Sequence, residues 1–256
     1  IEAYNFPEIV NLTDLKILLG SKKDKELGDL AKRMGYEKVI RNLFSKEERR
    51  ISSAKKILAS LQGKKTGKTT TGVDTNAIAG QAILIHEKLL RKKGFEIIRT
   101  NAHPSKRLTE VLFENGLHNV NAYGPNNEEK KRTNLDPELR DDYSLMTKGH
   151  FRRTLIEPAL RIPLTIMGGD MNHPIGDKHN GYKLNSHDLE MKDIIHNSDA
   201  TNIFECWPTE EPLPPTHERG NTIDWIAASN NLLPAIQSIS IGTQTVDSDH
   251  VVIGTR

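Results

Sequence analysis

Four short segments place acids, amides, a tyrosine or a histidine where a predicted buried strand begins or ends. In the clearest of them, the mostly apolar residues 163–167 lead into Gly168 and Gly169, and Asp170 and Asn172 follow. Sheets of α/β proteins build active sites where their strands end. The other segments carry Tyr123 with Asn126, Asp224 within residues 222–226, and Asp249 with His250 ahead of residues 251–253. Together the four segments predict one polar site assembled from several strands.

The residue types in these segments suit work on a phosphate group. Asp170 and Asn172 lie two residues apart, so in extended chain both side chains reach one ligand, such as a metal-bridged phosphate and its attacking water. Asp224 lies inside an apolar strand, where a carboxylate is costly without a partner. Asp249 is a hard oxygen ligand for Mg²⁺, and His250 exchanges a proton near neutral pH. Singly, Asp224 and His250 also fit structural roles, so the inference rests on all four segments occurring together.

Strands and helices alternate along the whole chain without a repeat or an obvious linker. This pattern predicts one α/β domain over residues 1–256 with a large sheet content. We expect strands at residues 15–19, 82–85, 95–98, 108–112, 120–123, 163–167, 202–204, 222–227, 235–241 and 250–253. We expect helices at residues 24–34, 45–63, 137–160 and 188–195, with a capping box of Ser45 and Glu48 opening the second. The polar residues 63–76 predict an exposed, mobile loop.

Composition and charge narrow the class of protein. Hydrophobic residues make up 36% of the chain and charged residues 27%, and no run approaches the roughly 18 apolar residues that a membrane span requires. We therefore expect no membrane partner. The single Cys206 suits a reducing compartment.

Residues 1–110 hold 23 Lys and Arg against 13 Asp and Glu, a balance of +10, and the remainder has a balance of −8. The basic half is either a set of solvated helix faces or a surface for a polyanion.

The chain contains incomplete versions of two common motifs. Residues 63–69 have three residues between their glycines, where a P-loop requires four, and they follow an amphipathic helix instead of a buried strand. His86-Glu87 begins like the helix of a zinc protease, but Leu90 stands where the second histidine is required. The sequence therefore disfavours a P-loop NTPase, and it offers no convincing tetrahedral zinc set.

The four segments, in their order along the chain, resemble the endonuclease/exonuclease/phosphatase superfamily. The matching motifs are Asn-Ala-Tyr-Gly-Pro-Asn at residues 121–126, Gly-Gly-Asp-Met-Asn at 168–172, Ile-Asp-Trp-Ile at 223–226 and Ser-Asp-His at 248–250. The resemblance covers residues 80–256 and includes the strand that begins Gly-Gln-Ala-Ile at residue 80. Thr216-His217, shortly before Asp224, is most similar to the branch of LINE-type retrotransposon endonucleases. Residues 1–79 are divergent and basic.

The resemblance implies an α/β/β/α sandwich of four layers and Mg²⁺-dependent (or Mn²⁺-dependent) hydrolysis of phosphodiesters. By the same resemblance, Tyr123 contacts the scissile phosphate, Asp170 orients or deprotonates the attacking water, and Asn172 holds phosphate and water. Asp249 binds the metal, and His250, oriented by Asp224, stabilises the phosphorane or acts as acid/base. The residues expected to contact nucleic acid are Asn126, Thr216, Lys55, Lys56, Lys64 and Lys65.

The N-terminal part departs from the family. Family members carry a metal-binding Glu at the end of an early apolar strand and an Asn on an earlier one. Shortly after the predicted strand 15–19, Ser21 stands at the position of the Glu, and Asn5 is the nearest match for the Asn. Two hypotheses follow: a metal-dependent endonuclease of the retrotransposon or abasic-site type, or a non-enzymatic descendant that binds nucleic acid within an assembly. Phosphatase action on lipids or small phosphoesters is a third, without a distinguishing feature.

The expected partner is nucleic acid, with DNA preferred over RNA. Because the chain opens at Ile1 and not at Met, we expect it to be a piece of a larger polypeptide or assembly. The expected location is intracellular, with the nucleus first and an organelle as the alternative.

Overall fold

The computed structural model describes residues 7–65, 80–125, 146–172, 186–206, 215–217, 222–242 and 253–255. The strands are β1 (Ile9–Leu12), β2 (Tyr36–Asn42), β3 (Gln81–His86), β4 (Ile97–Ala102), β5 (Leu108–Phe113), β6 (His118–Ala122), β7 (Thr165–Asp170), β8 (Ala200–Asn202), β9 (Asp224–Ser229), β10 (Ile239–Ile241) and β11 (Ile253–Thr255). The helices are α1 (Lys22–Arg33), α2 (Lys46–Lys65), α3 (Glu87–Leu90), α5 (Lys148–Phe151), α6 (Glu157–Leu160) and α7 (Ser186–Asn197).

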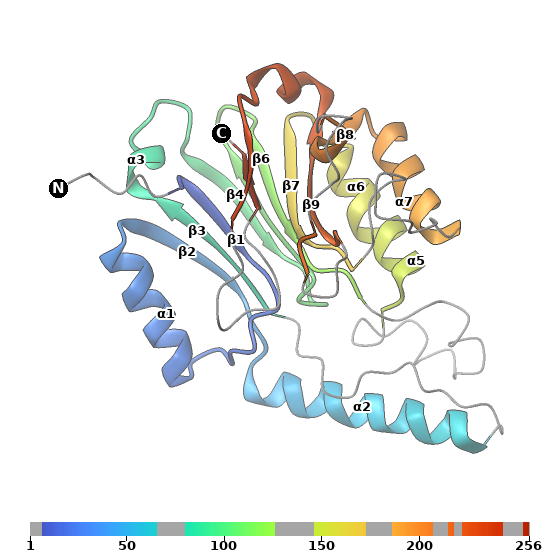
Figure 1. The fold of residues 1–256 in the computed structure, drawn as a ribbon. Coiled ribbons are helices and arrows are strands. Elements are labelled where there is room, and N and C mark those ends of the chain that lie inside the picture. The colour runs from blue at the N-terminus through green and yellow to red at the C-terminus, as the bar shows by residue number, and fades with distance from the viewer. Residues whose placement is uncertain are drawn as a thin grey trace.

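The smaller sheet has the strand order β1-β3-β2, with both outer strands antiparallel to β3. Its central strand, residues 81–86, is buried along its whole length. One face of this sheet packs against α1, where Ala31, Tyr36 and Leu84 form a small apolar cluster. Figure 1 shows α1 outside this sheet, as one outer layer of the molecule.

The larger sheet has the strand order β4-β5-β6-β7-β9-β8, in which β6 and β7 are parallel and the other pairs are antiparallel. Its outer face packs against α5, α6 and α7 (Figure 1). The core there includes Phe151, Met167 and Trp225, all fully buried. A π-helical turn, Arg152–Ile156, joins α5 to α6. Strands β10 and β11 form a separate two-stranded antiparallel sheet.

The two sheets pack face to face, which completes the predicted α/β/β/α sandwich. At one end their interface is apolar, with Ile83 and Ile85 of β3 against Val111 and Phe113 of β5. At the other end it is polar, and side-chain amides of one sheet donate to carbonyls of the other. The contacts are Asn11 Nδ2 to the carbonyl of Val120 (3.2 Å), Asn121 Nδ2 to that of Leu12 (2.8 Å), Gln81 Nε2 to that of Asn121 (3.1 Å) and Asn42 Nδ2 to that of Leu108 (2.9 Å).

The amides of Asn42, Gln81 and Asn121 are buried, so leaving them without acceptors would cost about 1–3 kcal/mol each. The bonds therefore fix the relative position of the two sheets at this end of the sandwich.

The capping box and most of the predicted elements are confirmed, within a few residues at their ends. The amide N–H of Ser45 donates to Glu48 Oε2 at 2.7 Å, and the N–H of Glu48 donates to Ser45 Oγ at 3.1 Å. The helix runs on to Lys65 instead of ending at Gly63, so the first residues of the predicted loop 63–76 are helical. Residues 202–204 were predicted as a strand; β8 ends at Asn202 and a 3₁₀ turn follows.

The strand prediction in the N-terminal part is wrong. Residues 15–19 form no strand and make only an isolated bridge, Leu18 to Phe44. The N-terminal strands are instead β1 and β2, which the sequence pattern did not indicate. In β2, a register shift between Tyr36 and Lys38 interrupts the alternation, and the consecutive residues Glu37 and Lys38 are both exposed.

No helix in the described part of the chain is long and apolar enough to cross a membrane.

A buried contact between a carboxylate and a histidine lies on the outer face of the larger sheet. His118 Nε2 is 3.3 Å from Glu110 Oε1, and Asn101 Nδ2 donates to Glu110 Oε2 at 2.5 Å. Burial raises the pKa of Glu110, but the hydrogen bonds from His118 and Asn101 and the charges of His118 and Arg99 outweigh it, so this pKa lies below the ordinary 4.5. A depressed carboxyl pKa contributes stability that is present above the unfolded-state value and lost as the pH falls through the folded-state value.

We expect Glu110→Gln to lower the free energy of unfolding at pH 7 by about 1.5–3 kcal/mol, because the buried carboxylate loses its charge-assisted contacts with His118 and Asn101. The difference from wild type should shrink as the pH falls below 4.5, where the wild-type carboxylate becomes protonated. Urea denaturation at a series of pH values measures both effects. Glu114→Gln, at an exposed turn position, is the control and should change little. An equal loss at every pH would contradict the assignment.

Candidate functional site

Strand direction brings the predicted site residues to one edge of the sandwich. Because β1 and β2 run antiparallel to β3, and β6 runs parallel to β7, the carboxyl ends of β1 and β2 share one edge of the small sheet, and those of β6 and β7 share one edge of the large sheet. The bonds from Asn121 to Leu12 and from Asn42 to Leu108 place these two edges together. The site edge therefore combines residues of both sheets.

Gly169 makes the close approach of these strands possible. A Cβ on this residue would lie 2.0 Å from the carbonyl oxygen of Ala122 and 3.0 Å from Cγ2 of Thr13, and its φ is +145°. Side chains other than hydrogen are excluded by both the contact and the backbone conformation. The glycine pair of the motif therefore allows the end of β1 and the end of β6 to lie against β7, directly beside Asp170.

Asp170 and Asn172 lie together, as the sequence predicted. The carboxylate of Asp170 accepts from the backbone N–H of Asn172 at 2.9 Å and from its Nδ2 at 3.3 Å. The same Nδ2 donates to the carbonyl of Gly124 at 2.8 Å. Asn172 has a φ of +51°, a conformation that asparagine tolerates better than most residues. These bonds fix the orientation of the Asp170 carboxylate.

Asp224 lies directly opposite Asp170 across the β7–β9 pair. Opposite residues of an antiparallel pair share a face, with Cβ atoms about 5 Å apart, and like charges there are destabilising. Both acids are buried, with 5% of Asp170 and 7% of Asp224 exposed. Thr216, which is fully buried, accepts from the backbone N–H of Asp224 at 3.0 Å and of Ile223 at 3.1 Å. Two facing acids at a sheet edge form an environment that favours a cation.

Tyr123 packs beside the acids and is held by Arg107. The guanidinium of Arg107 stacks over the tyrosine ring, 5.1 Å from its centroid, and donates to the carbonyl of Tyr123 at 3.2 Å. Burial, then the charges of Asp14 and Asp170, raise the pKa of Tyr123 far above its ordinary value, and Arg107 offsets only part of this. The phenol is therefore neutral at all ordinary pH values and acts as a hydrogen-bond donor.

Asp14 is a site residue that sequence reasoning missed. It follows β1 by two residues, its side chain hydrogen bonds with that of Tyr123, and its φ is +49°. Backbone strain of this kind in a residue other than glycine is often found at functional sites. The sequence signal would have been an acid shortly after a strand, but the predicted strand begins six residues after the start of β1. Arg107 was missed as well, because a single arginine in a turn carries no pattern.

The structure thus brings together Tyr123, Asp170, Asn172 and Asp224 of the predicted site. Asn126, Asp249 and His250 lie outside the described residues. Thr216 lies at the site, and its hydroxyl binds the backbone that leads into Asp224; its contact with nucleic acid stays a prediction. Lys55 is half-buried on α2, and Lys56, Lys64 and Lys65 belong to the same helix.

The predicted position of the family's metal-binding Glu is wrong. Ser21 is the N-cap of α1, where its Oγ accepts from the N–H of Asp24 at 3.3 Å, and it does not follow a strand. The early strand is β2, which ends in the buried Asn42. Asn5 lies outside the described residues, and β1 carries Asn11, which binds the large sheet. Among the described residues, no group of three or more His, Cys, Asp and Glu side chains could hold a metal ion.

Comparisons with known proteins identify the fold. No family model matches the sequence, and no curated protein matches it. Among solved structures, it is similar to a 3′-5′ exonuclease, NExo, from Neisseria meningitidis, with a TM-score of 0.63 and 15% identity over 99% of this chain and 90% of that one. A structure of the 3′ phosphatase NExo from Neisseria bound to product DNA hairpin gives a TM-score of 0.61 and 16% identity, with 99% and 90% coverage.

An AP endonuclease from Archaeoglobus fulgidus gives a TM-score of 0.60 and 13% identity, and the match covers 96% of this chain and 87% of that one. At these identities the likeness establishes the fold and nothing finer. The four-layer architecture, the facing acids at one sheet edge and these structural neighbours agree: the chain has the endonuclease/exonuclease/phosphatase fold.

Proposed function

We propose that this chain is a Mg²⁺-dependent phosphodiesterase, an endonuclease that nicks DNA at the edge formed by β6, β7 and β9. One observation carries the proposal: the buried acids Asp170 and Asp224 face each other beside a neutral, buried Tyr123. A fold alone does not define an activity, so the argument rests on this arrangement. Retrotransposon-type and abasic-site-type cleavage both remain candidates within it.

Each side chain has a role in the proposed reaction. Asp170, oriented by Asn172, accepts a proton from the attacking water, whose oxygen forms a bond to phosphorus as the ester P–O bond breaks. Tyr123 donates a hydrogen bond to a phosphate oxygen on which charge develops. His250, oriented by Asp224, protonates the departing oxygen or stabilises the phosphorane.

Magnesium (or manganese) suits the chemistry of this donor set. Mg²⁺ prefers carboxylate oxygens, and the facing acids Asp170 and Asp224 give this sheet edge the negative charge that attracts a cation. We assign the metal ligand to Asp249. When bound, the ion neutralises charge on the phosphate and lowers the pKa of a bound water.

Nucleic acid is the proposed substrate class for two reasons. The basic N-terminal half provides counter-charges for a phosphate backbone, and one structural neighbour was solved bound to product DNA hairpin. The test is cleavage of supercoiled plasmid, an abasic duplex, an intact duplex and an RNA duplex by the purified chain, with Mg²⁺, Mn²⁺ or EDTA. We expect metal-dependent nicking of DNA. Metal-independent nicking, or cleavage of none of these substrates, would overturn the proposal.

A second candidate is a non-enzymatic nucleic-acid-binding subunit of a larger assembly. The observation in its favour is the end of β2, which carries Asn42 and no carboxylate. Glu48, which follows it, is engaged by Ser45 and Lys106. In this case the chain should bind DNA or RNA with a steep salt dependence and cleave neither.

Both candidates predict that the lysines of α2 contact the nucleic-acid backbone. Replacing Lys55, Lys56, Lys64 and Lys65 by Gln should flatten the dependence of log affinity on log salt concentration by roughly 0.9 for each phosphate that a lysine no longer neutralises. Fluorescence anisotropy with a labelled duplex at several salt concentrations measures this slope.

The matched control replaces four exposed lysines of α1, Lys22, Lys23, Lys25 and Lys32, with the same change in net charge. Their helix lies on the outer face of the small sheet, so the slope should not change (Figure 1). Equal effects of the two quadruple variants would remove α2 as the binding surface.

A further inference from the structure

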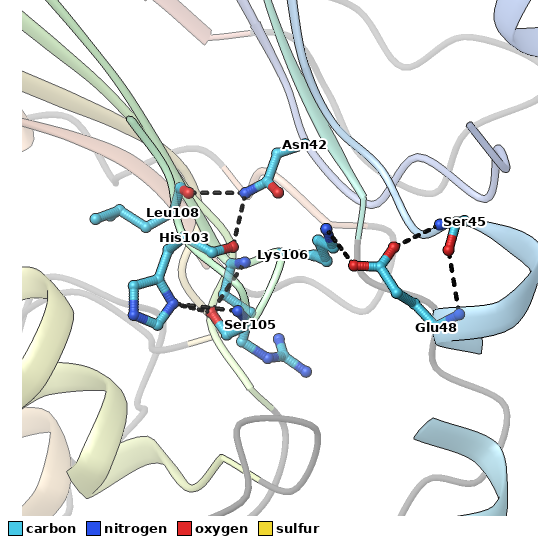
Figure 2. Close-up of polar contacts among 8 residues, drawn as sticks. Asn42, Ser45, Glu48, His103, Ser105, Lys106 and Leu108 are labelled. Carbon is cyan, nitrogen blue, oxygen red and sulfur yellow. Dashed lines mark hydrogen bonds and ion pairs between the residues drawn. The ribbon is translucent and has the colours of Figure 1, made fainter. Parts of the chain in front are cut away.

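The turn between β4 and β5 is connected to the junction of β2 and α2. Residues 103–107 form this turn, and Asn42 Nδ2, at the end of β2, donates to the carbonyl of His103 at 3.2 Å and to that of Leu108 at 2.9 Å. Within the turn, Ser105 Oγ lies 2.8 Å from His103 Nδ1 and accepts from the N–H of Arg107 at 3.2 Å. Figure 2 shows this network beside the start of α2. The turn is therefore held at both of its ends.

Glu48 links this turn to α2. Its Oε2 accepts from the N–H of Ser45 at 2.7 Å, which caps the helix, and its Oε1 lies 3.1 Å from Lys106 Nζ (Figure 2). One carboxylate thus serves the helix and the turn simultaneously. Since both oxygens are engaged, a rotation of the first turn of α2 would displace Lys106.

Lys106 is held firmly for a lysine. Its side chain is only 14% exposed, and the ammonium lies 5.8 Å from the centroid of the Phe44 ring. Its φ of +59° places the residue in the left-handed region, which costs roughly 1 kcal/mol for a residue other than glycine. An ion pair contributes more to stability when its side chains are held in place than when they are freely exposed. The contact with Glu48 therefore helps to hold the turn in this conformation.

The next residue, Arg107, holds Tyr123 of the candidate site. Besides the stacking and the side-chain bond to the Tyr123 carbonyl, the backbone N–H of Tyr123 donates to the carbonyl of Arg107 at 2.9 Å. A continuous series of contacts thus runs from α2 through Glu48, Lys106 and Arg107 to Tyr123.

We propose that Glu48 is a positioning residue, which acts through Lys106 and Arg107 to place Tyr123 and so joins α2 to the reacting centre. The role in the reaction rests on the proposed function. In Figure 1, α2 begins at one edge of the sandwich and runs along that edge. The contacts from α2 to Tyr123 would then hold a phosphate backbone, bound by the lysines of α2, at a fixed position relative to the site.

Two variants test the connection without removing the cap of the helix. Glu48→Gln keeps an acceptor for the N–H of Ser45, since glutamine also serves in a capping box, but it has no charge for Lys106. Lys106→Met keeps the apolar stem beside Phe44 and removes the ammonium. The control is Glu47→Gln, the same change one residue earlier, where the carboxylate meets exposed Arg50 at 3.5 Å.

We expect Glu48→Gln and Lys106→Met each to lower kcat for nicking about tenfold while KM changes less than twofold, because a displaced hydrogen-bond donor weakens the transition state more than binding. The double variant should be no slower than either single variant. Glu47→Gln should match wild type. The proposal would be overturned if the two losses in kcat multiplied in the double variant, or if Glu47→Gln and Glu48→Gln had equal effects.

Hydrogen exchange gives a readout that does not depend on activity. In both single variants the amides of Arg107 and Tyr123 should exchange about tenfold faster, because each is bonded within or to the turn. The amide of Met171, bonded to the carbonyl of Ile223 at 2.9 Å, should not change. Unchanged exchange at Arg107 and Tyr123 would overturn the connection even in an active protein. If wild type cleaves nothing, the proposed function fails, and the exchange rates still decide whether Glu48 positions Tyr123.

Discussion

Asp170→Asn is expected to lower the rate of DNA nicking by about 10²- to 10⁴-fold, the range typical for removal of a general base. Asparagine has almost the same shape and still accepts the backbone N–H of Asn172, which Asp170 accepts at 2.9 Å. It cannot accept the proton of the attacking water. The measurement is single-turnover nicking of supercoiled plasmid at saturating Mg²⁺, so that a change in metal affinity does not contribute.

The same variant should be as stable as wild type or more stable. Asp170 faces Asp224, and both are buried, so removal of one negative charge relieves a like-charge contact. Sites arranged for catalysis often carry such a cost in stability. Asp193→Asn, at an exposed position of α7, is the control and should retain full activity. Nicking by Asp170→Asn within twofold of wild type would remove Asp170 from the reaction.

Gly169→Ala is expected to destabilise the protein by about 3 kcal/mol or more. Its Cβ would lie 2.0 Å from the carbonyl oxygen of Ala122, and a φ of +145° is strained for alanine. The backbone must move to relieve both, and Asp170 is the next residue. We therefore also expect nicking to fall about 10²-fold in the fraction that folds, because small displacements of a catalytic group are costly.

Gly168→Ala provides a neighbouring control for this prediction. There the nearest atom to a new Cβ is Cγ1 of Ile226, a side-chain atom at 3.3 Å, and the residue has no strained φ. The loss should be less than about 1 kcal/mol, measured by urea denaturation of both variants. If the two alanine variants were equally stable, the close approach of β6 and β1 to Gly169 could not be correct.

The sequence predicted the carboxyl-edge site because its signals are local. Gly168-Gly169-Asp170 is the end of the mostly buried strand β7, and the apolar run that leads into it is visible in the sequence without knowledge of the fold. The capping box of Ser45 and Glu48 is equally local, and the structure has it as predicted. A functional residue can be predicted from the sequence when its partners lie within a few residues of it in the same strand or helix.

The N-terminal part could not be predicted, because its strands are short or irregular. β2 contains a register shift, and its exposed charged residues Glu37 and Lys38 are consecutive, so it has no clear alternation. β1 has four residues, and the apolar run after it was more strand-like than the strand itself. The role of Asp14 depends on a left-handed backbone conformation and on packing against Tyr123, more than 100 residues away in the sequence. Tertiary contacts of this kind leave no local pattern.

The most direct test of the central claim is the nicking rate of wild type, Asp249→Asn and Asp170→Asn as a function of Mg²⁺ concentration. We predict a saturable metal dependence in wild type. Asp249→Asn should require at least about tenfold more Mg²⁺ to reach half of its maximum, since it loses a charged ligand. Asp170→Asn should be marked by a strongly reduced maximum at saturating Mg²⁺. Nicking that persists in EDTA, or three curves of the same shape and height, would contradict the assignment of a metal-dependent phosphodiesterase site.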